Sequence, residues 1–259
     1  MADLSPKAQE IRARDGRILE IARELLNQGG YAGVTIGKIA AALGYSRGTI
    51  YNHFSCKEDA LLTLAARYYE RQLAFCERAA AFRGRARERM VAVGEANELF
   101  LRLYPEEASI IEVVCAQAIR NRSTSECRAR LRECEIRVNS VVEGIVRDAI
   151  AQGDLSLPDG VSVRSLTFGF WALTMGGYAT MLGILSIPAA NLDDVFEEVR
   201  TNCNTLADGF GWHPLSSEWD YEATLRRLHN EVFSEEMRRL ETPAAVATHE
   251  TATPPEKNT

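Results

Sequence analysis

Apolar residues recur at the spacing of an α-helix along almost the whole of this chain, and this feature limits the possible folds more than any other. The clearest stretch has one helix face formed by Ile18, Ile21, Ala22, Leu25 and Leu26. No stretch alternates apolar and polar residues for long enough to predict a β-strand. We therefore expect an all-α fold, and an apolar content of 46% can supply a sizeable core.

Capping and turn residues divide the first part of the chain into three helices. Gly29-Gly30 ends the first helix, and Thr35 then caps a second helix that ends at Gly44. Ser46 caps a third helix, which runs to about His53. These signals predict a compact N-terminal domain over residues 1–56.

A long helix is expected to follow, from Lys57 to about Phe82, opened by a capping box of Ser55 and Glu58. Later helices are predicted at about 86–103, 105–121, 124–152, 160–186, 191–210 and 218–240. Together they form a second helical domain over residues 57–241. Residues 242–259 are rich in threonine, proline and alanine without apolar periodicity, which predicts a disordered tail.

The segment from Thr35 to Phe54 reads TIGKIAAALGYSRGTIYNHF, two short helices joined by a tight turn at Gly44, which is the pattern of a helix-turn-helix. The polar side chains left outside on its second helix are of the kinds that read base edges or bind phosphates. The charge distribution agrees with an anionic partner. The first 57 residues carry eight basic and five acidic side chains, although the chain as a whole has a net charge of −6.

The stretch from Gly30 to Leu62 resembles the DNA-binding signature of the TetR family of bacterial transcriptional regulators, and the resemblance covers about residues 16–65. The matching features are Tyr31, Thr35, Ile39-Ala40, Gly44, Ser46, Gly48-Thr49-Ile50-Tyr51, His53-Phe54 and Lys57. The rest of the chain resembles the family only in its helical pattern and length. The resemblance implies a homodimeric regulator, usually a repressor, that a small ligand releases from a palindromic DNA operator.

Physical reasons support the individual DNA contacts. The Thr35 hydroxyl and the Ile36 amide lie at a helix N-terminus, which attracts a phosphate. Gly48 lets the third helix approach the duplex closely, and Arg47 can bind a guanine through two N–H groups. We expect the DNA-contacting residues to be Thr35, Ile36, Ser46, Arg47, Gly48, Thr49, Tyr51, Asn52, His53 and Lys57.

Two positions depart from the family pattern. Gly37 stands where a longer polar residue is usual, which removes one DNA contact and weakens its helix by up to about 1 kcal/mol relative to alanine. Cys56 lies beside Lys57 at a helix N-terminus, an environment that would lower its thiol pKa. A redox-responsive regulator of the same fold, using Cys56 or the core cysteines, is therefore an alternative to control by a ligand.

Two helix faces in the second domain predict a homodimer through the helices near 160–186 and 191–210. The first helix carries small residues at heptad spacing, which allow close approach of another helix: Ser162, Ser165, Gly169, Ala172, Gly176, Ala179, Gly183 and Ser186. The second carries an apolar face made of Leu192, Val195, Phe196, Val199, Cys203, Leu206 and Phe210. The alternative is that these faces pack within one subunit.

The other side of the small-residue helix is bulky and predicts an effector cavity. The candidate lining residues are Phe100, Tyr104, Val114, Cys115, Ile119, Trp171, Met175 and Tyr178. Their chemistry favours an apolar or aromatic effector. The alternative is that these side chains fill a core without a cavity.

Other functional classes find little support in the sequence. No GxSxG, glycine-rich phosphate loop or HExxH motif is present, so an enzyme with an accessory DNA module is a weak alternative, and we expect no cofactor. The six cysteines lack zinc-site spacing, so we expect no metal, and without a secretory signal we expect a cytoplasmic protein. The uncharged run from Ser165 to Leu192 is long enough to span a membrane, but its glycines, threonines and proline favour a buried helix.

Overall fold

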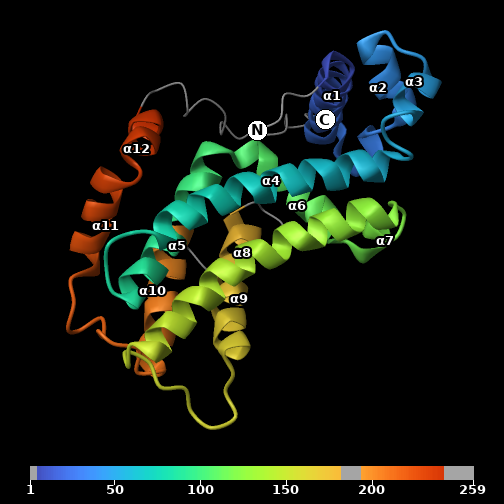
Figure 1. Cartoon of the computed structure of the whole chain (residues 1–259). Coiled ribbons are helices and arrows are strands. Elements are labelled where there is room, and N and C mark those ends of the chain that lie inside the picture. Colours follow the sequence, from blue (N-terminus) through green and yellow to red (C-terminus); the bar gives the residue numbers. More distant parts are fainter. Residues whose placement is uncertain (1–4, 182–193, 242–259) are drawn as a thin grey trace, which may run out of the picture.

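The computed structural model describes residues 5–181 and 194–241, and every regular element in these ranges is an α-helix. The all-α prediction is confirmed. The helices in chain order (Figure 1) are α1 (Pro6–Gly33), α2 (Ile36–Leu43), α3 (Arg47–Tyr51), α4 (Lys57–Ala80), α5 (Ala86–Leu103), α6 (Pro105–Cys115), α7 (Gln117–Arg120), α8 (Ser125–Ala151), α9 (Val163–Met181), α10 (Val195–Gly209), α11 (Tyr221–Glu231) and α12 (Ser234–Glu241).

The three N-terminal helices follow the predicted signals closely. Helix α1 begins well before its apolar face at Ile18, because Ser5 caps it and Pro6 occupies its first position. Its regular part ends at Gly29 and Gly30, where Gly30 has a φ of 58°, and one further turn leads to Gly33. Helix α3 is shorter than predicted and ends at Tyr51.

The predicted capping box at the start of α4 is wrong. Cys56 holds the cap position, and no side chain accepts a hydrogen bond from the first turn. Glu58 is buried, and its carboxylate accepts a hydrogen bond from the Tyr31 hydroxyl, so this side chain connects α4 to the end of α1. A tertiary hydrogen bond has replaced the local one that the sequence spacing suggested.

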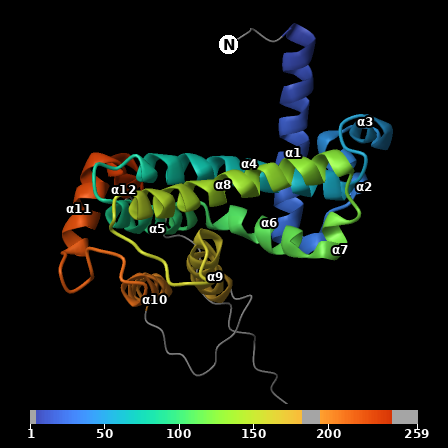
Figure 2. The same ribbon diagram turned by 60° about the horizontal axis from the view of Figure 1, so that its bottom comes forward.

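The larger domain is built on α4, which packs along α8 and α5. Figure 2 shows these three helices as one layer, with α9 and α10 side by side beneath it. Helices α11 and α12 pack against α5, at the end of the molecule opposite the N-terminal helices (Figure 1). The larger domain therefore has two layers of helices, with a cavity between them.

Two predicted helices are each divided in two. The helix expected at 105–121 is interrupted at Ala116, which has an extended backbone with ψ 114°. The helix expected at 218–240 is interrupted between α11 and α12, where Phe233 is fully buried and stacks on Phe75 with ring centroids 5.7 Å apart. Burial of this ring favours an irregular backbone there over continued helix.

The predicted helices near 160–186 and 191–210 correspond to α9 and α10, which pack on each other within the chain. A Cβ atom on Gly169 would lie 3.0 Å from Leu206 of α10, and one on Gly177 would collide with Val199. Part of the small-residue face and of the apolar face is therefore used inside the subunit. Residues 182–193 and 242–259, which include Gly183, Ser186, Leu192 and the predicted tail, lie outside the described residues.

The uncharged run that begins at Ser165 contributes most of α9, which is packed against α8 and α10. Among the helices of residues 5–181 and 194–241, none combines the length and the apolar character that crossing a bilayer requires.

Candidate nucleic-acid interface and effector cavity

The helix-turn-helix is held by the capping residues that the sequence suggests. The Lys38 N–H donates to Thr35 Oγ1 at 3.2 Å, which caps α2. Gly44 ends α2 with a φ of 67°, a left-handed conformation that glycine adopts without strain. The Thr49 N–H donates to Ser46 Oγ at 3.1 Å, which caps α3. The two short helices are thus fixed by local hydrogen bonds on both sides of the turn.

A shallow surface groove lies where α2, α3 and the start of α4 meet. It is lined by Thr35, Ile36, Gly37, Arg47, Tyr51 and Lys57, so residues from three separate helix ends converge on one concave surface. Arg47 lies against Gly37, because a Cβ atom there would be 3.1 Å from Arg47 Nη2. Tyr51 is 53% exposed although it is a large aromatic residue. The groove combines a helix N-terminus, a guanidinium and a phenol, which are groups that bind phosphates and base edges.

The remaining predicted DNA contacts fall into two groups. Ser46, Gly48 and Asn52 are exposed, and Thr49 is half-buried with its hydroxyl 2.9 Å from that of Ser46. A Cβ atom on Gly48 would meet nothing closer than Ser46 Oγ at 3.6 Å, so the protein itself leaves room there. The free space in front of this glycine faces solvent, as close approach to a duplex would require.

His53 and Lys57 are turned toward the protein. His53 Nδ1 lies 2.6 Å from an Asp15 carboxylate oxygen, and the His53 side chain is only 7% exposed. Lys57 Nζ donates to the Tyr31 carbonyl at 2.9 Å and lies 3.6 Å from the centre of the Tyr31 ring. Burial lowers the pKa of Lys57, although the amine still contributes to the groove. In this conformation His53, just after α3, and Lys57, at the start of α4, both contact residues of α1.

Sequence reasoning missed a set of contacts that joins the start of α4 to the segment before α8. Asp59 is buried, and its carboxylate accepts hydrogen bonds from the Thr124 N–H at 2.7 Å and the Thr124 hydroxyl at 3.0 Å. Arg122 donates to the Tyr31 hydroxyl at 3.2 Å. These partners are more than 60 residues apart in sequence, so no local pattern could have indicated them.

The thiol of Cys56 does not have the environment that the sequence suggested. Burial, with the charges of Asp59 and Glu58, raises its pKa to about 11, and its Sγ donates to the Arg122 carbonyl. Burial also raises the pKa of the other described cysteines, which are Cys76, Cys127, Cys134 and Cys203. The expectation of a lowered pKa at Cys56 is therefore wrong, and the pKa values of these thiols do not support the redox alternative, which stays an untested prediction.

A cavity of about 390 Å³ lies between the two layers of the larger domain, lined by residues of α4, α5, α7, α8, α9 and α10. Of the predicted lining residues, Trp171, Met175 and Tyr178 face it. Phe100 and Val114 are fully buried in the main core, and Tyr104 packs against that core. Ile119 is half-buried outside the lining, and the side chain of Cys115 is not among those described. The space is larger than a packing defect and lies within the range of small-molecule sites.

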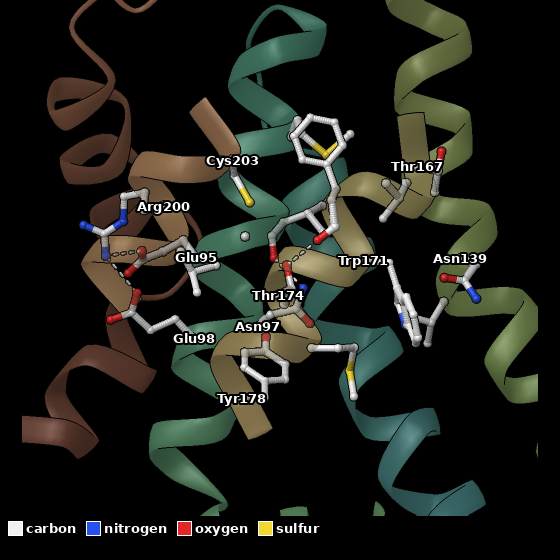
Figure 3. A pocket seen from close by; sticks show the side chains of 18 of the residues that line it. Glu95, Asn97, Glu98, Asn139, Thr167, Trp171, Thr174, Tyr178, Arg200 and Cys203 are labelled. Carbon is white, nitrogen blue, oxygen red and sulfur yellow. Dashed lines mark hydrogen bonds and ion pairs between the residues drawn. The ribbon is translucent and has the colours of Figure 1, made fainter. Parts of the chain in front are cut away.

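One end of the cavity carries charged groups that the sequence did not indicate (Figure 3). Arg200 of α10 lies 2.8 Å from Glu98 and 3.7 Å from Glu95, both on α5. Burial and the neighbouring charge of Glu95 raise the pKa of Glu98. Trp171 and Asn139 lie at the opposite end, and Asn97, Thr174 and Tyr178 lie between the two ends (Figure 3). The cavity is therefore amphiphilic rather than purely apolar.

Known proteins resemble this chain both in the helix-turn-helix region and in the fold of the domain that contains the cavity. Residues 18–64 match the model of "Bacterial regulatory proteins, tetR family", a range that spans most of α1, all of α2 and α3, and the start of α4. The N-terminal part of the chain therefore matches the tetR family. The match contains the whole groove and ends before the first residues that line the cavity.

One curated relative shows the same division. The HTH-type transcriptional repressor AcnR of Corynebacterium diphtheriae is 43% identical over 56 residues, which cover 22% of this chain and 30% of that protein. The chain thus spans under a third of the length of this relative.

Two solved structures share the fold over most of the chain. FadR of Bacillus subtilis in complex with stearoyl-CoA has a TM-score of 0.58 at 20% identity, covering 75% of this chain and 98% of that one. A putative transcriptional regulator of Saccharomonospora viridis in complex with choline has a TM-score of 0.56 at 24% identity, covering 76% and 96%. The tetR-family fold therefore extends through the cavity-bearing domain.

Proposed function

We propose that this chain is a sequence-specific DNA-binding transcriptional regulator, a homodimeric repressor that a small effector releases from a palindromic operator. The observation that carries the proposal is the groove of Thr35, Ile36, Gly37, Arg47, Tyr51 and Lys57, which gathers DNA-binding groups on an exposed face of the helix-turn-helix. DNA binding is supported by the similarity of this domain to AcnR, which is named a transcriptional repressor.

The groove supports a specific mode of contact. The first N–H groups of α2, next to Thr35, have no partner within the helix and are suited to one backbone phosphate. Arg47 at the first position of α3 can reach a guanine edge in the major groove, with Tyr51 on a neighbouring phosphate. Ser46, Thr49 and Asn52 supply further polar contacts, and Gly48 allows close approach. We keep His53 and Lys57 in this set as residues whose present partners would have to be exchanged.

The part of the proposal that concerns the dimer rests on an apolar surface of α9. Phe168 is 61% exposed and Trp171 is 49% exposed, with their ring centroids 5.7 Å apart. Ser165 and Ala172 beside them are small and exposed, so a second helix could approach closely. Burial of this surface against its copy would place two recognition helices on one duplex, and half-sites one turn apart need a spacing of about 34–36 Å.

The part of the proposal that concerns the effector rests on the contacts between the cavity and the DNA-binding domain. Arg120, in the cavity wall, lies 2.7 Å from Glu135, and its carbonyl accepts a hydrogen bond from the Ser123 hydroxyl at 2.7 Å. The next residue, Thr124, is bonded to Asp59 at the start of α4. An effector that prefers one position of this segment would shift the spacing of the recognition helices by its differential affinity.

Selection of bound DNA from a random duplex pool tests the proposed DNA binding directly. We expect a palindromic site, bound by two subunits, with a salt dependence typical of several phosphate contacts. Recovery of a single unrepeated half-site, or of no enriched sequence at low ionic strength, would contradict the proposal.

A further inference from the structure

Besides Arg87, three polar side chains that line the cavity have a hydrogen-bonding oxygen atom without a partner. These atoms are Gln72 Oε1, Glu95 Oε2 and the Tyr178 hydroxyl oxygen. Their residues are 9%, 6% and 7% exposed, so bulk water does not reach them freely. Buried polar atoms are usually hydrogen-bonded, and unpaired ones that face a common space point to a ligand able to pair with them.

The unpaired atoms on Gln72 and Glu95 accept hydrogen bonds and cannot donate them. Gln72 Nε2 donates to Asn97 Oδ1 at 2.8 Å, and Asn97 Nδ2 donates to the Val93 carbonyl at 3.0 Å, which fixes the orientation of both amides. His229 Nε2 lies 2.6 Å from Glu95 Oε1, which leaves Oε2 with only a distant Arg200 at 3.7 Å. A matching ligand must therefore bring N–H or O–H donors.

The positive groups of the cavity already have acidic partners. Arg200 lies 2.8 Å from Glu98, Arg120 lies 2.7 Å from Glu135, and Arg87 lies 2.5 Å from Asp208. Arg87 Nε has no hydrogen bond, but the other two nitrogens of this guanidinium are held by Asp208 and by backbone and side-chain oxygens. An anionic ligand would have to displace a carboxylate from one of these pairs, which makes a carboxylate or phosphate head group a poor match.

The rest of the lining is suited to an apolar body. Phe170, Trp171 and Met175 of α9 line the space together with Val138 and Val142 of α8. Figure 3 places Trp171 at the end of the cavity away from Glu95 and Glu98. A ligand that spans this distance would present an apolar part to the indole and a donor part to the acidic end.

We propose that the cavity binds an amphiphilic amine, with the ammonium N–H groups directed at the free oxygen of Glu95 and an aromatic or aliphatic body against Phe170, Trp171 and Met175. Gln72 and Tyr178 can pair with a second donor on the same molecule. The inference deepens the proposed function, on which it rests, by naming the chemical class of the effector. It also separates this chain from a regulator of anionic acyl thioesters, although both share the fold.

Calorimetric titration of the full-length protein with three matched probes tests the ligand class. The probes 4-phenylbutylamine, 4-phenylbutanol and 4-phenylbutyrate share one body and differ in the head group. We expect the amine to bind with a Kd at least about tenfold below that of the acid, with the alcohol between them. Equal or tighter binding of the acid, or no binding of any probe, would overturn the inference.

Two variants locate the site. Glu95→Gln keeps the size of the side chain and one acceptor but removes the charge, and we expect it to abolish the advantage of the amine over the alcohol. The control is Glu70→Gln, the same change at an exposed residue of α4 outside the cavity, which should retain that advantage. An amine preference that survives Glu95→Gln would contradict the placement.

A separate measurement keeps this inference distinct from the proposed function. Operator affinity with and without the amine, measured by fluorescence anisotropy, reports only on effector control. Amine binding without a loss of operator affinity would count against ligand-controlled release and leave the ligand class standing. Release of the operator by the acid and not by the amine would overturn the ligand class and leave release intact.

Discussion

At the scale of single residues, the position of Arg47 depends on a glycine in the preceding helix. The Arg47 guanidinium lies where a side chain at Gly37 would be, with only 3.1 Å between Nη2 and a Cβ atom built there. In the sequence, Gly37 looks like a lost DNA contact and a weak point in α2. In the structure it is the space that allows an arginine to lie across the N-terminus of α2, next to Thr35.

Arg47→Ala should relax the base preference at one position of each half-site. Loss of a bidentate guanine contact costs about 1–3 kcal/mol of discrimination, whereas Lys57→Ala removes a charge and should weaken binding to all sequences alike. Competition titrations with the preferred site and with single-base variants measure both effects. If Arg47→Ala lowers the affinity for all sites equally, Arg47 binds a phosphate rather than a base.

At the scale of elements, α4 connects the two functional regions. Its first turn contacts the end of α1 through Lys57 and Glu58 and the start of α8 through Asp59, and its later part supplies Gln72 to the cavity. A rotation or shift of this one helix therefore changes both the groove and the cavity wall. The coupling depends on hydrogen bonds made by a few residues at the N-terminal end of α4.

Asp59→Ala should destabilise the fold and weaken this connection. The variant leaves the Thr124 N–H without its acceptor, and a lost buried acceptor costs about 1–3 kcal/mol of unfolding free energy. The control is Glu70→Ala, which also removes a link from α4 to α8, but an exposed one to Arg130 at 3.1 Å, worth about 0–1 kcal/mol. Urea unfolding with unchanged m-values measures both, and equal costs would contradict the role of Asp59.

Asp208 of α10 pairs with Arg87 of α5, and we expect this contact to make the free energy of unfolding depend on pH in the acid range. Burial opposes ionisation of Asp208, but the Ser216 N–H and the Arg87 guanidinium outweigh it and hold the pKa below its ordinary 3.8. Because the folded-state pKa is lowered, this stabilisation is complete above the ordinary pKa and is lost as pH falls through the folded-state value.

We therefore expect the unfolding free energy of the wild type to fall more steeply below about pH 4 than that of Asp208→Asn. Thermal or urea unfolding between pH 3 and 6 checks this difference between the two proteins. The same steepness in both would show that Asp208 does not contribute to the pH dependence.

At the scale of the whole molecule, the proposed function requires a second copy of the chain. One subunit presents one short recognition helix, and a palindrome is read by two such helices held at a fixed spacing. The exposed rings of Phe168 and Trp171 lie on α9, and Trp171 also lines the cavity. In the proposed dimer, an occupied cavity would therefore adjoin the surface that sets the spacing of the recognition helices.

Phe168→Glu should produce a monomer, because a buried carboxylate without a partner opposes association. Operator affinity should then fall by about 100-fold or more, since the two half-sites are no longer bound as one unit. Light scattering and anisotropy measure the two effects. The control is Ile136→Glu, which places the same charge on an exposed apolar position of α8, 57% exposed, and should leave the dimer intact.

The sequence by itself determined the helices whose signals are local. Thr35, Gly44 and Ser46 act on neighbouring backbone groups, so the bounds of α2 and the start of α3 could be predicted, and so could the exposed face of the helix-turn-helix. Aromatic and small residues in α9 also indicated a cavity wall at Trp171, Met175 and Tyr178. In these cases the information lies within one or two helical turns.

Tertiary structure decided what depends on partners far away in the chain. Glu58 bonds to Tyr31 rather than capping α4, the Cys56 pKa is raised by burial that no neighbouring residue reveals, and Phe100 packs in the core instead of lining the cavity. The acidic end of the cavity forms because α10 places Arg200 beside Glu95 and Glu98 of α5. Burial and charge pairing are properties of packed helices, and periodicity along a sequence does not specify which helix packs on which.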